Sequence, residues 1–380
     1  MKNCRILIIT GLIILSENLL ACTAFYYAKG EKVIIGNNED WNNPFSMIWF
    51  VPANEKEYGR VYFGFKEGGF QGAINDQGLW FDGFALKYKP SESSSNKDVY
   101  NGNIIEKVLK EYSTVDEVIN EFKKYNLQFL SSSMFIFGDR FGNSAIIEQD
   151  SIIKRTGHYQ ISTNFRQSEL KEDSITDKRY NYAREIIRKN DQVTVDIARN
   201  ILSTTHQEGK YPTQYSYICD LNEGKIYLYH FHNFENVVVF NLKEELKKGK
   251  HSYEIQSLFP KSYAAERYKE PIVDSINARL ASKTIVSVNE RVYNKYVGIY
   301  EVDPNVWPGE FFEVSSEKGK LFIEASFLLK SEILPESDSQ YFFVGADETF
   351  EYKFIYDSSK PIPELNVKMY GTEVVCKKIK

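Results

Sequence analysis

The chain has 380 residues, of which 42% are hydrophobic and 15% aromatic, and its formal net charge at pH 7 is −5. A chain of this length and composition can bury a substantial core, in one large or two ordinary domains. The acidic balance argues against nucleic acid or an anionic membrane surface as the main partner.

The first 21 residues predict a secretory signal peptide. Lys2 and Arg5 supply a positive start, Ile6–Ile14 is an apolar run, and Ala21 is the small residue that a signal peptidase requires. The run is too short to be a comfortable membrane span. We therefore expect export to the periplasm or the extracellular space, with Cys22 as the first residue of the mature protein.

An N-terminal cysteine carries its own base. Its α-amine, with a reference pKa of roughly 7.7–8.0, can take the thiol proton near neutral pH, which indicates an N-terminal-nucleophile (Ntn) hydrolase. Leu19-Leu20-Ala21-Cys22 also resembles a lipobox, whose cysteine is lipidated, and this alternative predicts a lipid-anchored, non-catalytic binding protein. The strand pattern that begins at Thr23 favours the nucleophile, because a lipoprotein normally continues as a flexible polar tether.

The chain from Cys22 to about residue 265 alternates groups of strands with pairs of helices. Strands are expected at Thr23–Ala28, Val33–Gly36, Met134–Gly138, Ser144–Glu148, Tyr215–Asp220 and Lys225–His230, with others before residue 90. Helices are expected over Ile104–Tyr112, Val115–Tyr125, Thr176–Arg188 and Val193–Thr204, and Ser113 with Asp116 suggests a capping box before the second of them. Ser91–Asn96 reads as a serine-rich loop. This order predicts an α+β domain of helices packed over stacked sheets.

After Pro271 the pattern changes to one short helical stretch and then repeated strands. The expected strands are Lys295–Val302, Glu310–Val314, Lys320–Glu324, Gln340–Val344, Thr349–Tyr356, Leu365–Met369 and Glu373–Lys378. Short strands at this spacing predict a separate small β-barrel-like accessory domain over residues 285–380. This segment shows no nucleophile pattern, which leaves a docking, lid or stabilising role open.

An N-terminal thiol needs partners, and the sequence offers two. Asp40 follows the second strand, so that a hairpin would return it beside Cys22 to orient the amine and stabilise its cationic form. Asn164 ends an apolar run and can supply a side-chain N–H for an oxyanion. An ordinary turn carboxylate and a turn-capping amide are the alternative interpretations of these residues.

Five segments, taken in order, resemble the linear amide C–N hydrolases, the superfamily of choloylglycine (bile-salt) hydrolases, penicillin V acylases and isopenicillin-N acyltransferase-like proteins. They are Cys22-Thr23-Ala24-Phe25, Gly36-Asn37-Asn38-Glu39-Asp40-Trp41, Ile74-Asn75-Asp76-Gln77-Gly78-Leu79, Ser162-Thr163-Asn164 and Tyr211-Pro212-Thr213-Gln214-Tyr215-Ser216. The resemblance implies a four-layer αββα Ntn-hydrolase sandwich over residues 22–265. It also implies Cys22 as nucleophile, Asp40 as orienter of its amine, and Asn164 and a backbone N–H near Ala85 as the oxyanion hole.

Two positions depart from the bile-salt hydrolases. Asn37 stands where those enzymes and the penicillin V acylases carry Arg, and Ala85 where bile-salt hydrolases carry Asn, so the chain looks closer to the acyltransferase-like branch. Arg179 is similar in position to the second arginine of the family's catalytic site, although its charged surroundings also suit a solvated helix start. A true bile-salt hydrolase remains an alternative.

The predicted reaction is cleavage of a linear non-peptide amide, or transfer of its acyl group, through an acyl-thioester on Cys22. Asn37, Trp41, Asn75, Trp80 and Phe81 are the candidate substrate-binding residues, and Trp49 is a further aromatic candidate for the acyl pocket. The expected partner is a small amide; a membrane contact follows only from lipidation, and a homo-oligomer is left open. No cofactor is expected.

Metal binding and structural disulfides are not expected either. His230 and His232 alternate on one strand, but the sequence shows no carboxylate or cysteine cluster to complete a metal site. Cys219 reads as a small buried hydrophobic residue on a strand.

Overall fold

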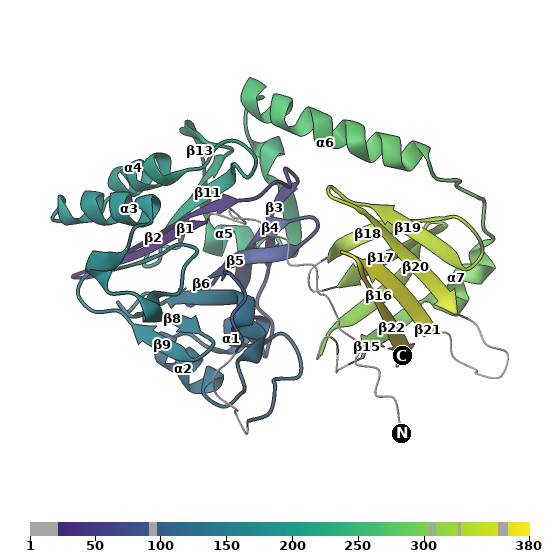
Figure 1. Cartoon of the computed structure of the whole chain (residues 1–380), viewed down its shortest axis with the longest axis horizontal. Coiled ribbons are helices and arrows are strands. Elements are labelled where there is room, and N and C mark those ends of the chain that lie inside the picture. The colour runs from purple at the N-terminus through teal and green to yellow at the C-terminus, as the bar shows by residue number, and fades with distance from the viewer. Residues whose placement is uncertain (1–21, 91–96, 304–305, 307–308, 326–327, 356–363) are drawn as a thin grey trace, which may run out of the picture.

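The computed structural model describes residues 22–90, 97–303, 306, 309–325, 328–355 and 364–380 (Figure 1). The predicted signal peptide and the predicted loop 91–96 lie outside the described residues. Within the described part of the chain, no helix combines the length and the apolar character needed to cross a membrane.

The described residues form a mixed α/β structure with two large antiparallel sheets. The first sheet has the strand order β10-β1-β2-β11-β12-β13. Its strands are β1 (Thr23–Lys29), β2 (Lys32–Asp40), β10 (Tyr159–Ser162), β11 (Thr213–Asp220), β12 (Lys225–His230) and β13 (Asn233–Asn241). The β1–β2 hairpin pairs Thr23 with Asn38, so that the residues just before β1 lie across from the end of β2.

The second sheet has the strand order β14-β3-β4-β5-β6-β7-β8-β9. Its strands are β3 (Ser46–Val51), β4 (Arg60–Phe65), β5 (Gly69–Asn75), β6 (Trp80–Ala85), β7 (Ser133–Gly138), β8 (Ser144–Glu148), β9 (Ser151–Lys154) and β14 (His251–Glu254). Strand β5 pairs with β6 only from Gly72 to Ile74, so the two strands separate toward the other end of β6.

The two sheets pack face to face around a common core. Alternate residues of β1 face opposite sides: Ala24 and Tyr26 point toward the second sheet, whereas Phe25 and Tyr27 point outward. On the inner side, Tyr217 of β11 stacks on Phe63 of β4 with ring centroids 4.0 Å apart. The space between the sheets is therefore filled by a core rich in aromatic side chains.

Helices cover the outer faces of both sheets. They are α1 (Ile104–Glu111) and α2 (Val115–Phe122) on the second sheet, and α3 (Lys178–Arg188) and α4 (Val195–Thr205) on the first. The capping box of α2 is formed by Thr114 and Glu117, one residue later than the predicted pair Ser113 and Asp116, because the Glu117 carboxylate reaches back to the Thr114 backbone N–H.

The remaining helices lie between strands of the sheets or, in the case of α6 and α7, between the sheets and the C-terminal strands. They are α5 (Leu242–Leu246), α6 (Tyr263–Ala281) and α7 (Glu290–Tyr296), with 3₁₀ helices at η1 (Gln128–Ser132), η2 (Gln167–Glu169), η3 (Glu172–Ser174) and η4 (Ile255–Leu258). Helix α6 contains Pro271, which the sequence analysis had placed before a short helix; instead, one 19-residue helix runs through it. In Figure 1, α6 extends from the paired sheets across to the C-terminal part.

The C-terminal strands close into a barrel. They are β15 (Gly298–Val302), β16 (Phe311–Glu317), β17 (Lys320–Ala325), β18 (Leu328–Pro335), β19 (Gln340–Val344), β20 (Thr349–Ile355), β21 (Glu364–Met369) and β22 (Thr372–Lys378). Strand β18 was missed by the sequence analysis, because its alternation is interrupted by charged and polar residues at Lys330, Ser331 and Glu332. Helix α7 packs on the barrel core through Tyr293 and Tyr296.

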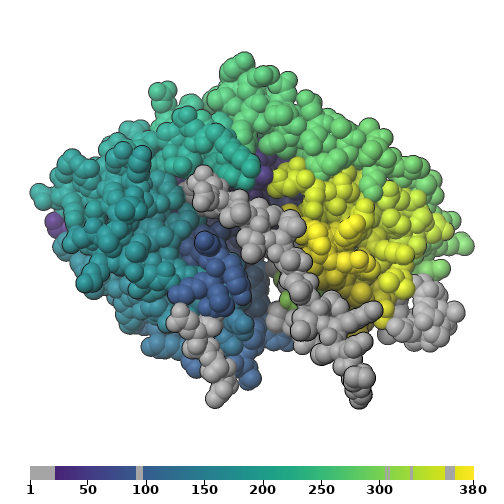
Figure 2. All heavy atoms as spheres, in the orientation of Figure 1, coloured from purple at the N-terminus to yellow at the C-terminus, as the bar shows by residue number. Residues whose placement is uncertain are grey.

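The barrel contacts the paired sheets at the turn between β4 and β5. Leu329 donates its backbone N–H to the carbonyl of Lys66, and Glu67 forms a β-bridge with Leu328. The buried Glu67 carboxylate also accepts the backbone N–H of Ala346 at 2.7 Å. In the space-filling view of Figure 2, the green α6 lies against the yellow barrel, consistent with the hydrogen bonds from Arg279 to barrel carbonyls.

Candidate functional site

Cys22 lies directly before β1 on the inner face of the first sheet. Because β1 pairs Thr23 with Asn38, the cysteine comes opposite Glu39 near the end of β2. The side chain is buried, and the thiol donates to Glu39 Oε1 with an S–O distance of 3.3 Å. The thiol therefore faces the space between the two sheets and not the solvent.

Glu39 is the site residue that the sequence analysis missed. Its second carboxylate oxygen accepts a hydrogen bond from Asn37 Nδ2 at 3.2 Å. Burial raises the pKa of Glu39 to about 7, against the opposing effect of the hydrogen bonds from Cys22 and Asn37. Strand periodicity was the available signal, since residues 37 and 39 share one face of β2 and that face is the one of Cys22.

The environment of Cys22 disfavours the thiolate. Burial raises the pKa of the Cys22 thiol, and the carboxylates of Glu39 and Asp40 raise it further, whereas a hydrogen bond from the Asp40 backbone N–H opposes the rise. Cys219 and Cys376 are also buried and free, and Cys219 lies within β11, in the core between the sheets, as expected. Of the described cysteines, Cys22 is the one in the wall of the cavity above Glu39.

Asp40 is the last residue of β2, so the hairpin brings it near Cys22 as the sequence predicts. Thr213 donates its hydroxyl to Asp40 Oδ1 at 2.5 Å, while Oδ2 is buried and, within the described structure, without a hydrogen-bond partner. Burial raises the pKa of Asp40, and the hydroxyl of Thr213 and the charge of Arg179 act against this rise. An unpartnered carboxylate oxygen beside the nucleophile is suited to hold a cation.

Arg179 reaches under Cys22 from the first turn of α3. Its Nη1 donates to the carbonyl oxygen of Cys22 at 2.9 Å and to Asn164 Oδ1 at 3.3 Å, and Nη2 forms an ion pair with Asp177 at 2.8 Å. Asp177 also caps α3 by accepting the Tyr180 backbone N–H. Of the two interpretations of Arg179, the solvated helix start is thus wrong: the guanidinium is bound into the site.

Asn164 and Ala85, the two positions predicted for the oxyanion hole, lie next to each other. Asn164 Nδ2 donates to the carbonyl oxygen of Ala85 at 3.0 Å. Because Arg179 binds Asn164 Oδ1, the orientation of the amide is fixed with its NH₂ group toward Ala85. The amide nitrogen carries a second N–H, which is the group that an oxyanion would use.

A cavity of about 530 Å³ opens above Cys22 and Glu39, between β5 and β6. Trp41 and Phe81, two of the predicted substrate-binding residues, line it, and so does Ala85. The other aromatic residues in its wall are Phe70, Phe84, Tyr100, Phe129 and Phe135. None of the described residues that line the cavity is Lys, Arg or His, and its acidic residues are Glu39 and Glu310.

Three residues predicted to bind substrate are placed elsewhere. Asn37 is buried behind Glu39. Asn75 donates to the carbonyls of Leu109 and Tyr112 and so fixes α1 to the end of β5. None of the three is among the described residues that line the cavity, so the structure does not bring them together with Trp41 and Phe81.

The third of them, Trp80, belongs to a buried network that the sequence analysis did not anticipate. Trp80 Nε1 donates to Tyr217 Oη at 2.9 Å, and this hydroxyl donates to Asp82 Oδ2 at 2.7 Å. Burial and the charge of Glu39 raise the pKa of Asp82. Trp49 also lies outside the cavity lining and stacks on Tyr62.

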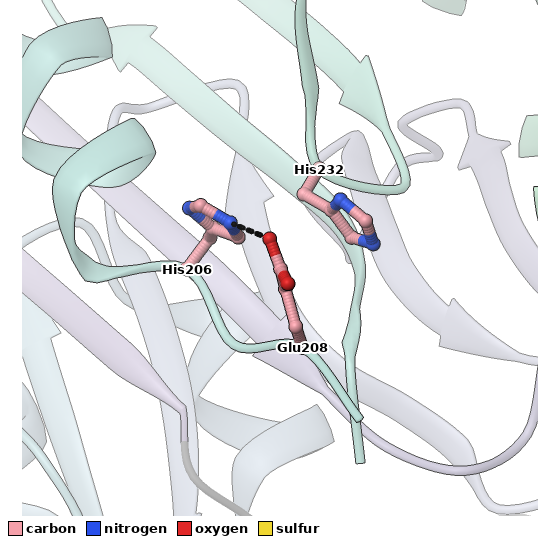
Figure 3. A group of neighbouring side chains, drawn as sticks. All are labelled: His206, Glu208 and His232. Atoms are coloured by element: carbon pink, nitrogen blue, oxygen red, sulfur yellow. Dashed lines mark hydrogen bonds and ion pairs between the residues drawn. The ribbon is translucent and has the colours of Figure 1, made fainter. Parts of the chain in front are cut away.

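The histidines group differently from the sequence expectation. His230 is buried and stacks on Phe259, and burial lowers its pKa to about 4. His232 instead lies near His206 and Glu208, with candidate ligand atoms within 4.8 Å of one another (Figure 3). His206 Nε2 and Glu208 Oε1 are 3.2 Å apart. None of the three residues lines the cavity, so we assign the group no part in the site.

Solved structures of two proteins are similar to this chain. Two solved variants of the conjugated bile acid hydrolase from Clostridium perfringens are each 17% identical to the chain; they cover 61% and 64% of it and 96% and 99% of their own length, with TM-scores of 0.48 and 0.50. The penicillin V acylase from Agrobacterium tumefaciens is 14% identical and covers 61% of this chain and 91% of its own, with a TM-score of 0.39. No family model and no curated protein matches the sequence. The variant with a TM-score of 0.50 shares its fold with this chain, so the resemblance indicated by the sequence motifs is confirmed at the level of the fold.

Proposed function

We propose that this protein is an Ntn-type hydrolase that cleaves a linear, non-peptide amide by attack of Cys22. The observation that carries the proposal is the placement of the Cys22 thiol on the floor of an aromatic cavity, with Asp40, Asn164 and Arg179 gathered around the same residue. The similarity in fold to the conjugated bile acid hydrolase supports an αββα sandwich of the Ntn type.

Removal of residues 1–21 is the activating step in this proposal. In the uncleaved chain, burial and neighbouring carboxylates hold the thiol in its protonated form. The freed α-amine supplies a base next to the sulfur, and the ammonium that forms is stabilised by the unpartnered oxygen of Asp40.

The reaction then proceeds in two steps. The α-amine takes the thiol proton and the sulfur attacks the amide carbon, while the free N–H of Asn164 and a backbone N–H near Ala85 bind the oxyanion. The C–N bond breaks as the α-ammonium returns a proton to the leaving amine, which leaves an acyl-thioester. Water, deprotonated by the same amine, attacks the thioester; the acid departs and the thiol is restored.

The burial of Cys22 also bears on the lipid-anchor alternative. A lipid on the sulfur would replace the hydrogen bond to Glu39 and would have to leave through the cavity between β5 and β6. We therefore propose that Cys22 is a nucleophile in an exported protein and that the aromatic cavity binds the acyl group. If an acceptor amine, in place of water, attacked the acyl-thioester on Cys22, the reaction would be acyl transfer.

The test is a pair of serine variants assayed on p-nitroanilides of apolar acids. Cys22→Ser should lower kcat/KM by about 10³-fold or more, because the hydroxyl is a much weaker nucleophile at neutral pH. Cys219→Ser, a matched change in the same core, should leave the rate within about twofold of the parent. Full activity in Cys22→Ser would disprove the mechanism, and mass spectrometry of trapped enzyme should locate the acyl group on the peptide that begins with Cys22.

A further inference from the structure

We propose that Glu39 selects substrates by charge: the enzyme acts on amides that join an apolar acyl group to a cationic or neutral amine, and it discriminates against amines that carry a carboxylate or sulfonate. The proposal rests on the proposed function and names its substrate class. It is based on the contacts of Glu39 and on the charges around the cavity.

Glu39 is close enough to the reacting atoms to sense the charge of the substrate. One carboxylate oxygen lies 3.3 Å from the Cys22 sulfur, and the side chain forms part of the cavity wall. When the sulfur bonds to the acyl carbon, groups a few bonds away on either side of the amide come within several ångströms of this carboxylate. At such distances, in a buried site, a charge on the substrate is strongly attracted or repelled.

The hydrogen bonds of Glu39 hold it in this position. Asn37 Nδ2 binds the oxygen that faces away from the sulfur, and Asn37 is itself fully buried in β2. The carboxylate is thus anchored from behind with its other oxygen toward the nucleophile. Such anchoring is what a charge selector requires, because a mobile side chain would turn away from an unfavourable substrate.

The other charged groups near the cavity do not offset Glu39 for an anionic substrate. Asp82 faces Glu39 from the second sheet, and Glu310 of the barrel lines the same cavity. Arg179 is held by Asp177 and by the carbonyl of Cys22, and it is not among the lining residues. The α-amine of a cleaved Cys22 supplies one cation, which Asp40 faces. The described lining therefore offers an anionic amine no guanidinium or ammonium side chain.

The experiment compares three amides with one apolar acyl group and three leaving amines: ethylenediamine, propylamine and glycine. At pH 8, above the pKa of about 7 of Glu39, the mature enzyme should show kcat/KM values in the order cationic, neutral, anionic, with at least a tenfold difference between the first and the last. Glu39→Gln should reduce this ratio by about tenfold, and Glu39→Asp, which keeps the charge, should retain most of it. The exposed Glu235 on β13 provides the matched control, since Glu235→Gln should leave all three values unchanged.

The outcomes separate this proposal from the proposed function. If no amide is cleaved, the proposed function fails. If the neutral amide is cleaved but the parent enzyme prefers the glycine conjugate, charge selection by Glu39 is overturned. An unchanged ratio in a folded Glu39→Gln variant would overturn it as well. If that variant does not fold, the ratio in the parent enzyme and in Glu39→Asp decides.

Discussion

The protein contains two β-rich cores, both rich in aromatic residues, that differ in how many ionisable side chains they bury. The core between the paired sheets buries the carboxyl groups of Glu39, Asp40 and Asp82, and one oxygen of each aspartate has no hydrogen-bond partner among the described residues. In the described part of the barrel, no Asp, Glu, Lys or Arg is buried, and Ser331 is the buried polar side chain. Tyr296 and Tyr300 of the barrel core satisfy their hydroxyls on backbone carbonyls.

The difference between the two cores indicates where the chemistry lies. A buried carboxylate costs free energy unless it is paired, so a fold selected for stability alone resembles the barrel. Clustered ionisable groups with displaced pKa values are instead typical of active sites. Three such groups lie around one thiol beside a cavity, and this clustering is why we place the proposed catalytic site in the paired sheets.

The largest effect is expected when the peptide bond before Cys22 cannot be cleaved. This change tests whether the buried carboxylates serve to stabilise the α-ammonium of Cys22. A protein that retains one uncleavable residue before Cys22 should lose about 10³-fold or more in kcat/KM, because the α-amine is then an amide and cannot accept a proton. The same protein with a protease site at this position should regain activity on trimming. Full activity in the extended protein would show that the reaction does not need the α-amine and that the buried carboxylates do not act by stabilising its cation.

A somewhat smaller effect is expected from Asn164→Ala. This variant changes a neutral polar group near Cys22, so its effect can be compared with that of the charged groups. Loss of one oxyanion donor should reduce kcat by about 10²–10³-fold with little change in KM. Asn181→Ala, which removes a side-chain hydrogen bond from α3 to the carbonyl of Ile175, is the matched control and should keep kcat within a few fold. A change confined to KM would indicate that Asn164 binds substrate and does not stabilise the oxyanion.

The smallest effect concerns Glu67, the buried carboxyl at the boundary between the two cores. Burial raises the pKa of Glu67 to about 7, above its ordinary value. A carboxyl with a higher pKa in the folded state contributes stability that is present at acid pH and is lost as the pH rises through its folded pKa. Between pH 5 and 8, the free energy of unfolding of Glu67→Gln should therefore rise by about 1–3 kcal/mol relative to the parent protein.

Urea unfolding of both proteins across this pH range measures the effect of Glu67. The exposed Glu313→Gln in β16 should track the parent protein at every pH. Parallel curves for the parent and Glu67→Gln would show that the boundary carboxyl is ionised at no cost, as it would be on an open surface.

Much of the secondary structure could be predicted from the sequence, because it depends on local patterns. The strands around Cys22, the helix ends near residues 104, 115 and 188, and most barrel strands follow from periodicity. Helix α6 could not be predicted, since contacts such as Arg279 with the barrel help to hold a helix that passes through Pro271. The domain boundaries and the export of the protein stay predictions.

The site residues could be predicted where they belong to the family motifs. They were harder to predict where tertiary packing determines which way a side chain points. Cys22, Asp40, Asn164 and Arg179 do come together. Trp80 was misplaced because an aromatic residue on a strand can face either the core or the cavity, and its sequence gives no preference. Glu39 was overlooked because a pattern of residue types does not state which neighbour touches the sulfur.

The turn between β4 and β5 joins the barrel to the cavity, and this connection affects how the protein can evolve. Lys66 and Glu67 are bonded to the barrel, while the next residue, Gly68, adopts φ +98° and lies so close to Trp41 that an added Cβ would come within 2.4 Å of its ring. Gly68 and Trp41 both line the cavity. The barrel is thus fastened to the backbone that shapes the cavity wall. If the cavity binds an acyl group, as proposed, an exchange of this module by recombination would also alter the range of acyl groups that it accepts.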